Sequence, residues 1–196
     1  MNFTKVVLFY ENKPITDFAA ARNKLLNDSK DDWILFLDTD EVISQELNNE
    51  ILKLVQNDNI NGYYLKRDDY FFGRWLRFGE TANVRLLRLG RKGSGKWKNP
   101  VHEVWNISGP TGELKNPLLH YSHPTIKSCI SKINQYTDIA AKDKKFNFFE
   151  LIYPIIKFIQ NYFLRRGFLD GFPGFVMAYM MSLHSLIVRV KTYDSL

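Results

Sequence analysis

The chain has 196 residues, of which 45% are hydrophobic and 24% charged, and this composition excludes an intrinsically disordered protein. Its net charge is +6, but no nucleic-acid-binding motif or basic arm accompanies that charge, so we expect no nucleic-acid partner. The single cysteine, Cys129, excludes an internal disulfide and a cysteine-based zinc site. Its apolar neighbours at helical spacing predict a core residue, and one thiol suits a reducing compartment.

Strands and helices are predicted to alternate over the first third of the chain. The run Trp33–Leu37 is apolar throughout, which is typical of a strand covered on both faces of a sheet. Asp17 and Ser44 are placed to cap the two helices on either side of it. The alternation predicts an α/β fold. The expected elements are a strand over 5–10, a helix over 17–29, a strand over 33–37 and a helix over 44–56.

After Asn61 the pattern changes to short extended segments separated by turn residues. The Gly- and Lys-rich stretch 90–97 is expected to be a turn or loop, and we favour a solvated hairpin over a mobile phosphate-binding loop. Helical spacing returns over 125–141, directly after Pro124. Short strands are expected over 62–71, 83–89, 101–105 and 117–123.

Two strongly apolar segments, roughly 148–164 and 172–188, follow. They are slightly short for membrane-spanning helices, so we expect them to lie in the interface of an anionic cytoplasmic leaflet. The alternatives are a helical pair packed on the sheet or in a dimer interface, and a hairpin of two spans. We therefore expect an α/β domain, 1–124, and a membrane-associated helical region, 125–196. The basic residues flanking the apolar segments are Lys144, Lys145, Arg165, Arg166, Arg189 and Lys191.

Three carboxylates, Asp38, Asp40 and Glu41, follow the apolar strand. In open α/β sheets ligands bind beyond the carboxyl ends of the strands, and residues two apart in an extended chain point the same way. Asp38 and Asp40 would therefore repel each other unless a cation lies between them, and oxygen ligands favour Mg²⁺ or Mn²⁺ carrying a diphosphate. The alternative is that these acids only begin the next helix, where the helix macrodipole favours them.

The segment DFAAARNKLLNDSKDDWILFLDTDEVIS, residues 17–44, resembles the central signature of family 2 glycosyltransferases of the GT-A fold. In that family a helix with an ARN-like sequence precedes an apolar strand ending in LDxDE. The stretches YYLKRDDYFFGRWLRFGE, VRLLR, VHE and LLHYSH extend the resemblance, to roughly residues 15–125, toward the branch that includes lipopolysaccharide-core glucosyltransferases. The fold implied is α/β, a GT-A-type, Rossmann-like mixed sheet flanked by helices, here with an apolar helical appendage at the C-terminus.

The resemblance implies a nucleotide-diphosphate sugar as donor, foremost a UDP-sugar, and Mg²⁺ or Mn²⁺ as cofactor. In the family the second acid of the motif, here Asp40, typically ligates the metal, while the first, Asp38, more often contacts ribose or water. Arg22 sits where the family has a residue near the nucleotide. A late histidine often joins the metal, and we prefer His120, which ends an apolar run, to His123. The alternative is a purely structural histidine.

Inverting transfer needs a general base that takes the proton of the acceptor hydroxyl. The family places an acid after the central strands, and VHE offers Glu103 as the base, with His102 supporting it or contacting the donor phosphate. The alternative is that Glu103 only pairs with a lysine or arginine. Cations must also stabilise the leaving diphosphate. Among Arg74, Arg85 and Arg88, Arg85 matches the family pattern best, although arginines of VRLLR can simply face solvent.

The family's first strand, helix and second strand have no counterpart before this region, so the resemblance implies an N-terminally truncated domain. A homodimer or a partner chain is then expected to supply the missing strands. The expected function is inverting, metal-dependent glycosyl transfer to a lipid-linked or lipopolysaccharide-type acceptor, at the inner face of the cytoplasmic membrane. The alternatives are a non-catalytic remnant that binds membrane or a partner chain and, more weakly, a nucleotidyltransferase on the same fold.

Overall fold

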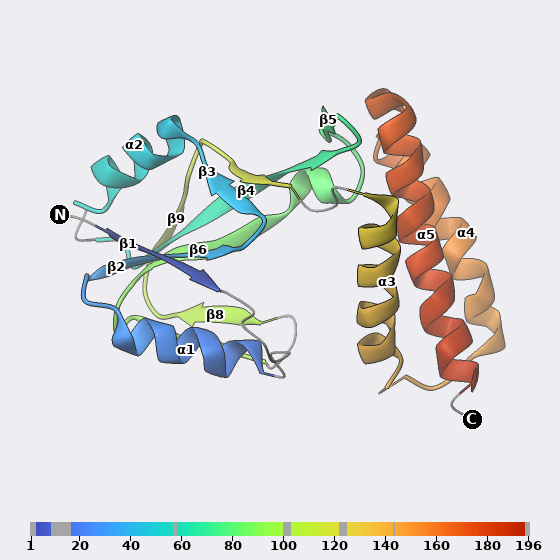
Figure 1. Ribbon diagram of the computed structural model, residues 1–196, viewed down its shortest axis with the longest axis horizontal. Helices are drawn as coiled ribbons and strands as arrows, with labels where there is room; N and C mark the ends of the chain where they lie inside the picture. Colours follow the sequence, from blue (N-terminus) through green and yellow to red (C-terminus); the bar gives the residue numbers. More distant parts are fainter. Residues whose placement is uncertain are drawn as a thin grey trace. The chain divides into compact units, whose positions relative to one another are not determined.

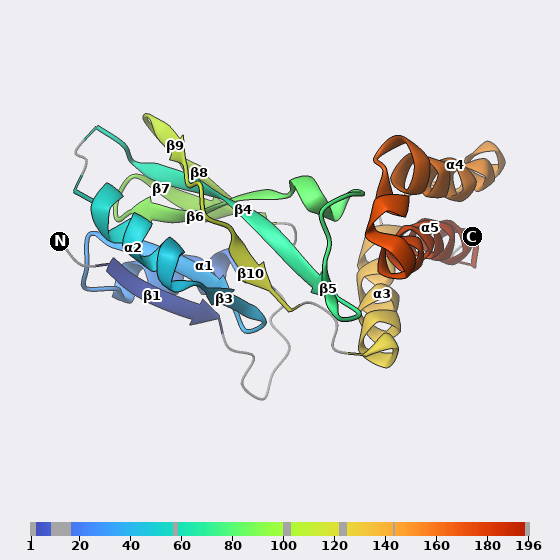
Figure 2. The same cartoon turned by 90° about the horizontal axis from the view of Figure 1, so that it is seen from above.

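The computed structural model describes residues 3–8, 17–56, 59–99, 103–121, 125–142 and 144–194 (Figures 1 and 2). The chain forms two compact units. The first contains Met1–Arg67 and Val84–His120, and the second contains Asp68–Asn83 and Tyr121–Leu196. The excursion 68–83 therefore groups with the C-terminal helices, a feature that the expected division after residue 124 did not include.

The first unit is built on a mixed β-sheet, as predicted. The outer strand β1 is parallel to β2, with Val6 opposite Phe36, whereas β6 is antiparallel to β2, with Leu35 opposite Leu89. Strand β9 (Thr111–Glu113) runs parallel to the start of β4. The strand order is β1 (Phe3–Leu8), β2 (Trp33–Asp38), β6 (Arg85–Arg91), β4 (Gly62–Phe71), β10 (Leu118–His120) and β3 (Glu41–Ile43).

Two helices cover opposite faces of this sheet (Figure 1). Helix α1 (Phe18–Asp28) is capped by Asp17, and α2 (Gln45–Leu54) by Ser44, as predicted. The alternation of side chains along β2 divides the core, because its odd-numbered residues pack with α2 and its even-numbered residues with α1. The run Trp33–Leu37 is therefore buried on both faces, which confirms the expectation from its apolar sequence.

The expected loop over 90–97 holds only for residues 92–94, because Gly90 and Arg91 end β6, and Gly95–Lys98 is strand β7, paired with β8 (Val104–Ile107). Trp97 lies opposite Trp105; the two rings stack with centroids 5.2 Å apart, and both meet Phe36 edge-on. This contact extends the core on the α1 face. The Gly- and Lys-rich composition concealed the strand, because Gly95 is required by packing: a Cβ there would lie 2.0 Å from the carbonyl oxygen of Asn106.

The second unit is mainly helical, and α3 and α4 both pack against α5 (Figures 1 and 2). The expected helix over 125–141 is confirmed as α3, capped by Thr125, and Cys129 is buried in it. The end of β4, from Asp68, also belongs to this unit. The other elements are β5 (Arg74–Trp75), the 3₁₀ turns η1 (Thr81–Asn83), η2 (Phe148–Ile152) and η4 (Gly167–Asp170), α4 (Tyr153–Ile159), its π-helical continuation η3 (Gln160–Leu164), α3 (Ile126–Ala141) and α5 (Gly171–Asp194).

A buried carboxylate joins the excursion 68–83 to these helices within the second unit. Asp170, which has no exposed surface, accepts hydrogen bonds at Oδ2 from the backbone amides of Arg77 and Phe78, both at 2.9 Å. Buried amides are costly to leave without an acceptor. Asp170 therefore fixes the loop after β5 against the turn that precedes α5.

The substitution Asp170→Ala is expected to lower the free energy of unfolding by about 3 kcal/mol, because two backbone amides lose their buried, charged acceptor. Urea unfolding followed by circular dichroism measures the change. Asp28→Ala, at an exposed position near the end of α1, serves as the control and should change stability by less than about 0.5 kcal/mol. Equal effects of the two substitutions would contradict the anchoring role of Asp170.

Candidate functional site

The carboxyl end of β2 carries an acid held by two arginines. Asp38 accepts from Arg22 Nη2 at 2.6 Å through Oδ1 and from Arg88 Nη2 at 2.7 Å through Oδ2. Arg22 comes from α1 and Arg88 from β6, so helix and sheet converge on this carboxylate. The charge that ends the apolar strand is therefore matched by cations from two other elements.

Arg22 extends the arrangement to the candidate base. Its side chain is only 1% exposed, and its Nε donates to Glu103 Oε1 at 3.0 Å. The guanidinium lies over the Trp97 ring, 4.8 Å from the centroid, which stabilises a cation by its interaction with the π-system. Glu103 thus pairs with an arginine, as the alternative from the sequence supposed, but that arginine is the one that holds Asp38.

A second carboxylate, Glu41, is buried beneath the first. Its Oε2 accepts from the backbone amide of Asp38 at 2.9 Å, and its Oε1 lies 3.9 Å from Arg88 Nη2. Burial, together with the negative charge of Asp38, raises the pKa of Glu41 against the opposing effect of Arg88. Burial acts in the same direction on Asp38, but there Arg88 and Arg22 outweigh it and hold the pKa of that carboxyl below its ordinary value.

Asp40 and His120 form a separate pair beside this network. The antiparallel pairing of β10 with β3 places His120 opposite Glu41, and His120 Nε2 lies 3.5 Å from Asp40 Oδ1. The structure therefore brings the preferred histidine to the second acid of the Asp-Thr-Asp motif. Both side chains are mostly buried but keep an accessible part.

The donor set at this end of the sheet fits a divalent cation that takes most of its ligands from a substrate. The described residues contain no group of three or more His, Cys, Asp or Glu side chains arranged for a metal, and both oxygens of Asp38 are occupied by arginines. Asp40 and His120 are two neighbouring side chains of the kinds that can bind such a cation. Mg²⁺ commonly takes only one or two protein carboxylates and completes its shell with phosphate oxygens and water.

A cavity of about 150 Å³ opens beside Glu103 within the first unit. Arg88 and Trp97 line it together with Glu103, so it joins the candidate base to the arginine that holds Asp38. Arg85, which the sequence favoured over Arg88, also borders this cavity. It is exposed, however, and forms an ion pair with Glu113.

Arg88 is the residue whose role the sequence did not single out, and the reason lies in the backbone. The pairing of β4 with β6 shifts at this point: Tyr63 lies opposite Leu89 and Tyr64 opposite Leu87, so the register skips Arg88. A β-bulge of this kind re-aims a side chain. The alternation of side chains along VRLLR therefore does not predict which way the Arg88 side chain points. Knowledge of the β-bulge is needed for that.

The remaining predicted site residues fall elsewhere. His102 and His123 lie outside the described residues. Arg74 belongs to the second unit, where its Nε lies 3.9 Å from Asp170 Oδ1. The structure thus brings Arg22, Asp38 and Glu103 into one network, places Asp40 with His120 in a neighbouring pair, and leaves Arg85 at the rim of the cavity.

Comparison with known proteins gives a consistent result. Residues 4–107 match the family model described as glycosyl transferase family 2. The chain is 26% identical over 192 residues to the lipopolysaccharide core biosynthesis glycosyltransferase LpsC of Rhizobium meliloti, covering 93% of this chain and 71% of LpsC. It is 31% identical over 164 residues to an uncharacterized glycosyltransferase of Rickettsia typhi and 29% identical over 189 residues to one of Rickettsia felis. The chain covers 56% and 65% of these two relatives.

The substitution Glu41→Gln is expected to stabilise the protein at neutral pH. The folded state raises the pKa of Glu41 above its ordinary value of 4.5, so the folded protein binds this proton more tightly than the unfolded chain does. The contribution of Glu41 to stability therefore falls as the pH rises from 4.5 through the raised pKa. The amide can still accept from Asp38 N–H and carries no charge. Urea unfolding at several pH values between about 4 and about 8 should show that the variant becomes more stable relative to the wild type as the pH rises.

Glu46→Gln is a suitable control with the opposite sign. Hydrogen bonds from its own backbone amide and from Ser44 lower the pKa of Glu46, so its stabilising contribution is present above its ordinary pKa of 4.5 and is lost as the pH falls. The free energy of unfolding of Glu46→Gln should therefore fall relative to that of the wild type as the pH rises. If the free energy of unfolding of Glu41→Gln instead fell relative to that of the wild type as the pH rises, the raised pKa of Glu41 would be contradicted.

Proposed function

The chain belongs to glycosyl transferase family 2, and from this premise we propose that its site moves a sugar, with inversion, from a nucleoside-diphosphate sugar to an acceptor hydroxyl. The observation that carries the proposal is Arg22, which binds Asp38 at the strand end and Glu103 beside the cavity. One buried cation thereby sets the distance between a donor-side acid and a candidate base. This is the spatial relation that a displacement at an anomeric carbon requires.

On the donor side, Asp38 is fixed by Arg22 and Arg88, and the second lone pair of each oxygen can accept from the ribose or its water. Among the described residues Arg88 Nη1 has no hydrogen-bond partner, and the Arg88 side chain lines the cavity, so it can receive an oxygen of the diphosphate. Asp40 and His120 would hold Mg²⁺ or Mn²⁺, which supplies positive charge against the departing diphosphate. We take a UDP-sugar as the donor.

On the acceptor side, Glu103 acts as the general base. As the acceptor oxygen forms its bond to the anomeric carbon, the bond from that carbon to the diphosphate oxygen breaks, and the hydroxyl proton passes to the Glu103 carboxylate. The hydrogen bond from Arg22 Nε holds Oε1 and orients the group toward the cavity. Trp97 forms part of the cavity wall beside Glu103.

Donor binding is expected to need both Mn²⁺ and Asp40. In calorimetric titration with UDP, Asp40→Ala should weaken Mn²⁺-dependent binding by at least about tenfold, because a cation ligand is lost. Glu103→Gln is the matched variant on the acceptor side, and it should bind UDP as the wild type does while sugar transfer falls by about 10² or more.

The outcome separates a transferase from a non-catalytic remnant. Failure of the folded wild type to bind UDP at millimolar concentration, with or without Mn²⁺, would overturn the donor site in this chain. Equal loss of binding in Asp40→Ala and Glu103→Gln would overturn the assignment of separate donor and acceptor roles.

We further propose that the acceptor is lipid-linked or of lipopolysaccharide type and that α4 brings the protein to the inner face of the cytoplasmic membrane. LpsC acts, by its name, in lipopolysaccharide core biosynthesis. Five apolar residues of α4 and its flanks are each 45% to 61% exposed. They recur at the spacing expected for one face of an interfacial helix. They are Ile152, Ile155, Ile156, Ile159 and Phe163.

A spanning helix is the less favoured arrangement. Within the described part of the chain, one helical stretch, Gly167–Asp194, is long and apolar enough to cross a bilayer, but a core helix passes the same test. It includes α5, which packs against both α3 and α4. The apolar stripe of α4 is exposed within the described part of the chain, and Arg165 and Arg166 follow it closely, as suits contact with anionic lipid.

The double substitution Ile155→Glu with Ile159→Glu is expected to weaken binding to anionic vesicles by at least about tenfold, because two apolar side chains leave the interface and two like charges are added. Co-sedimentation with vesicles measures the change. Ile130→Glu, an equally exposed isoleucine on α3, is the control and should have a small effect. Wild-type binding by the double variant would contradict the role of α4.

A further inference from the structure

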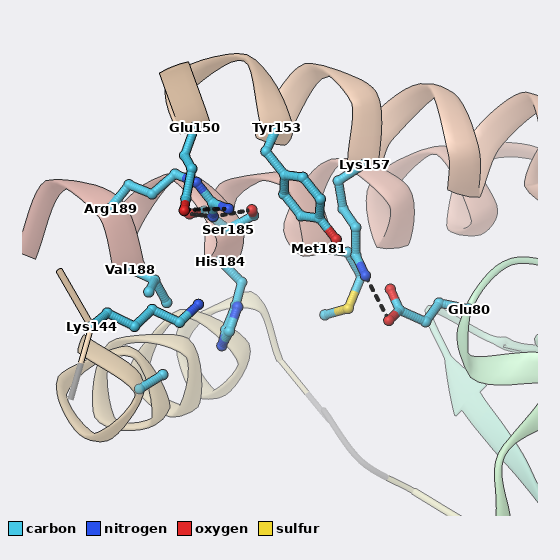
Figure 3. A pocket seen from close by; sticks show the side chains of 11 residues that line it. Glu80, Lys144, Glu150, Tyr153, Lys157, Met181, His184, Ser185, Val188 and Arg189 are labelled. Atoms are coloured by element: carbon cyan, nitrogen blue, oxygen red, sulfur yellow. Dashed lines mark hydrogen bonds and ion pairs between the residues drawn. The ribbon is translucent and has the colours of Figure 1, made fainter. Parts of the chain in front are cut away.

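A second cavity lies in the second unit, apart from the residues of the proposed transfer site. Its volume is about 630 Å³, and Figure 3 shows charged side chains from several elements pointing into it. Three basic residues face two acidic ones there. The lining that matters here is Lys144, Lys157 and Arg189 with Glu80 and Glu150, and the ring of Tyr153.

A buried cation forms one wall of this cavity. Arg189 is 9% exposed, and its Nη1 donates to the carbonyl oxygen and the hydroxyl of Ser185 at 2.9 and 2.8 Å. Its guanidinium lies 4.6 Å from the centroid of the Tyr153 ring. Among the described residues its Nε has no hydrogen-bond partner. The helix therefore fixes a guanidinium at the cavity whose charge the Ser185 contacts do not neutralise.

The charge of Arg189 is met by a half-exposed carboxylate. Glu150 Oε2 lies 3.2 Å from Arg189 Nη2, yet the Glu150 side chain is 45% exposed and comes from the short turn η2 (Figure 3). Because Arg189 is buried, its charge needs an anionic partner, and the half-exposed Glu150 is the partner that another anion can replace. Glu150 thus occupies the position on Arg189 that an anionic group of a ligand would take.

The other two cations differ in what they can offer. Lys157 is bound to Glu80 Oε1 at 2.7 Å, and Glu80 also accepts from Asn161, so both charges are already matched. Lys144 lines the same cavity, and among the described residues no ion pair engages it. Of the five charged side chains named above, Lys144 is the one without a charged partner among the described residues, which favours an anion over a neutral sugar.

We propose that this cavity binds the phosphate group of an amphiphile, received by Lys144 and by Arg189 after Glu150 has moved aside. Phosphate oxygens suit a guanidinium and an ammonium together. The lipid source is favoured because the neighbours of Glu150 along the chain, Phe148 and Phe149, are 72% and 85% exposed. An apolar chain and an anionic headgroup would thus be met side by side, and the inference does not depend on the donor site.

The test compares three variants on two ligands. Binding to phosphatidylcholine vesicles with and without phosphatidylglycerol is followed by co-sedimentation, and binding of glycerol phosphate by calorimetry. Lys144→Gln should weaken both by about fivefold, the effect of one membrane-facing charge. Lys145→Gln removes the same charge one residue further on, outside the cavity lining, and should weaken neither by more than about twofold. Glu150→Gln should tighten both, because the competing carboxylate is gone.

The order of the variants decides the proposal. The expected order is tightest binding by Glu150→Gln, then the wild type and Lys145→Gln, and weakest binding by Lys144→Gln. This order on vesicles, with or without the same order on glycerol phosphate, supports a lipid phosphate. This order on glycerol phosphate alone supports a soluble phosphate ester in the same cavity. Equal effects of Lys144→Gln and Lys145→Gln would reduce the binding to general surface charge and overturn the site. So would weaker binding by Glu150→Gln, provided its thermal unfolding matches that of the wild type.

Discussion

A single buried guanidinium holds the candidate site together. Arg22 is almost without exposed surface, so removing it from water is costly unless its donors and its charge are met. Asp38 and Glu103 meet its charge and accept from Nη2 and Nε, the Trp97 face lies beneath, and Nη1 has no hydrogen-bond partner among the described residues. Because these partners come from the end of β2 and from the segment before β8, the position of each depends on the same cation. The chemistry proposed for the site follows from that shared constraint.

The site nevertheless keeps an excess of negative charge. Four carboxylates gather near two arginines, and the histidine beside Asp40 adds positive charge only when protonated. Such an excess is stable when a cation joins the site, and it repels the anionic donor when none does. The carboxylates are Asp38, Asp40, Glu41 and Glu103, and the arginines are Arg22 and Arg88. The metal proposed for the site would offset this excess when the anionic donor binds.

Much of this arrangement could be predicted from the sequence, because its signals are local. The caps Asp17 and Ser44, the apolar run of β2 and the acids behind it each act within a few residues, and the predicted family and mixed α/β fold are confirmed. The failures share a different cause. Strand β7 and the grouping of 68–83 with the C-terminal helices depend on partners far along the chain, which composition does not report.

The bulge at Arg88 has a consequence for how the family can vary. Since β4 and β6 are in register on both sides of it, the arginine reaches Asp38 only while one strand is a residue longer than its partner. Substitutions along β6 change side chains one at a time, but loss of a single residue would turn a leucine toward the acid. In a relative, strand length at this position therefore carries as much information about donor-site competence as the presence of an arginine does.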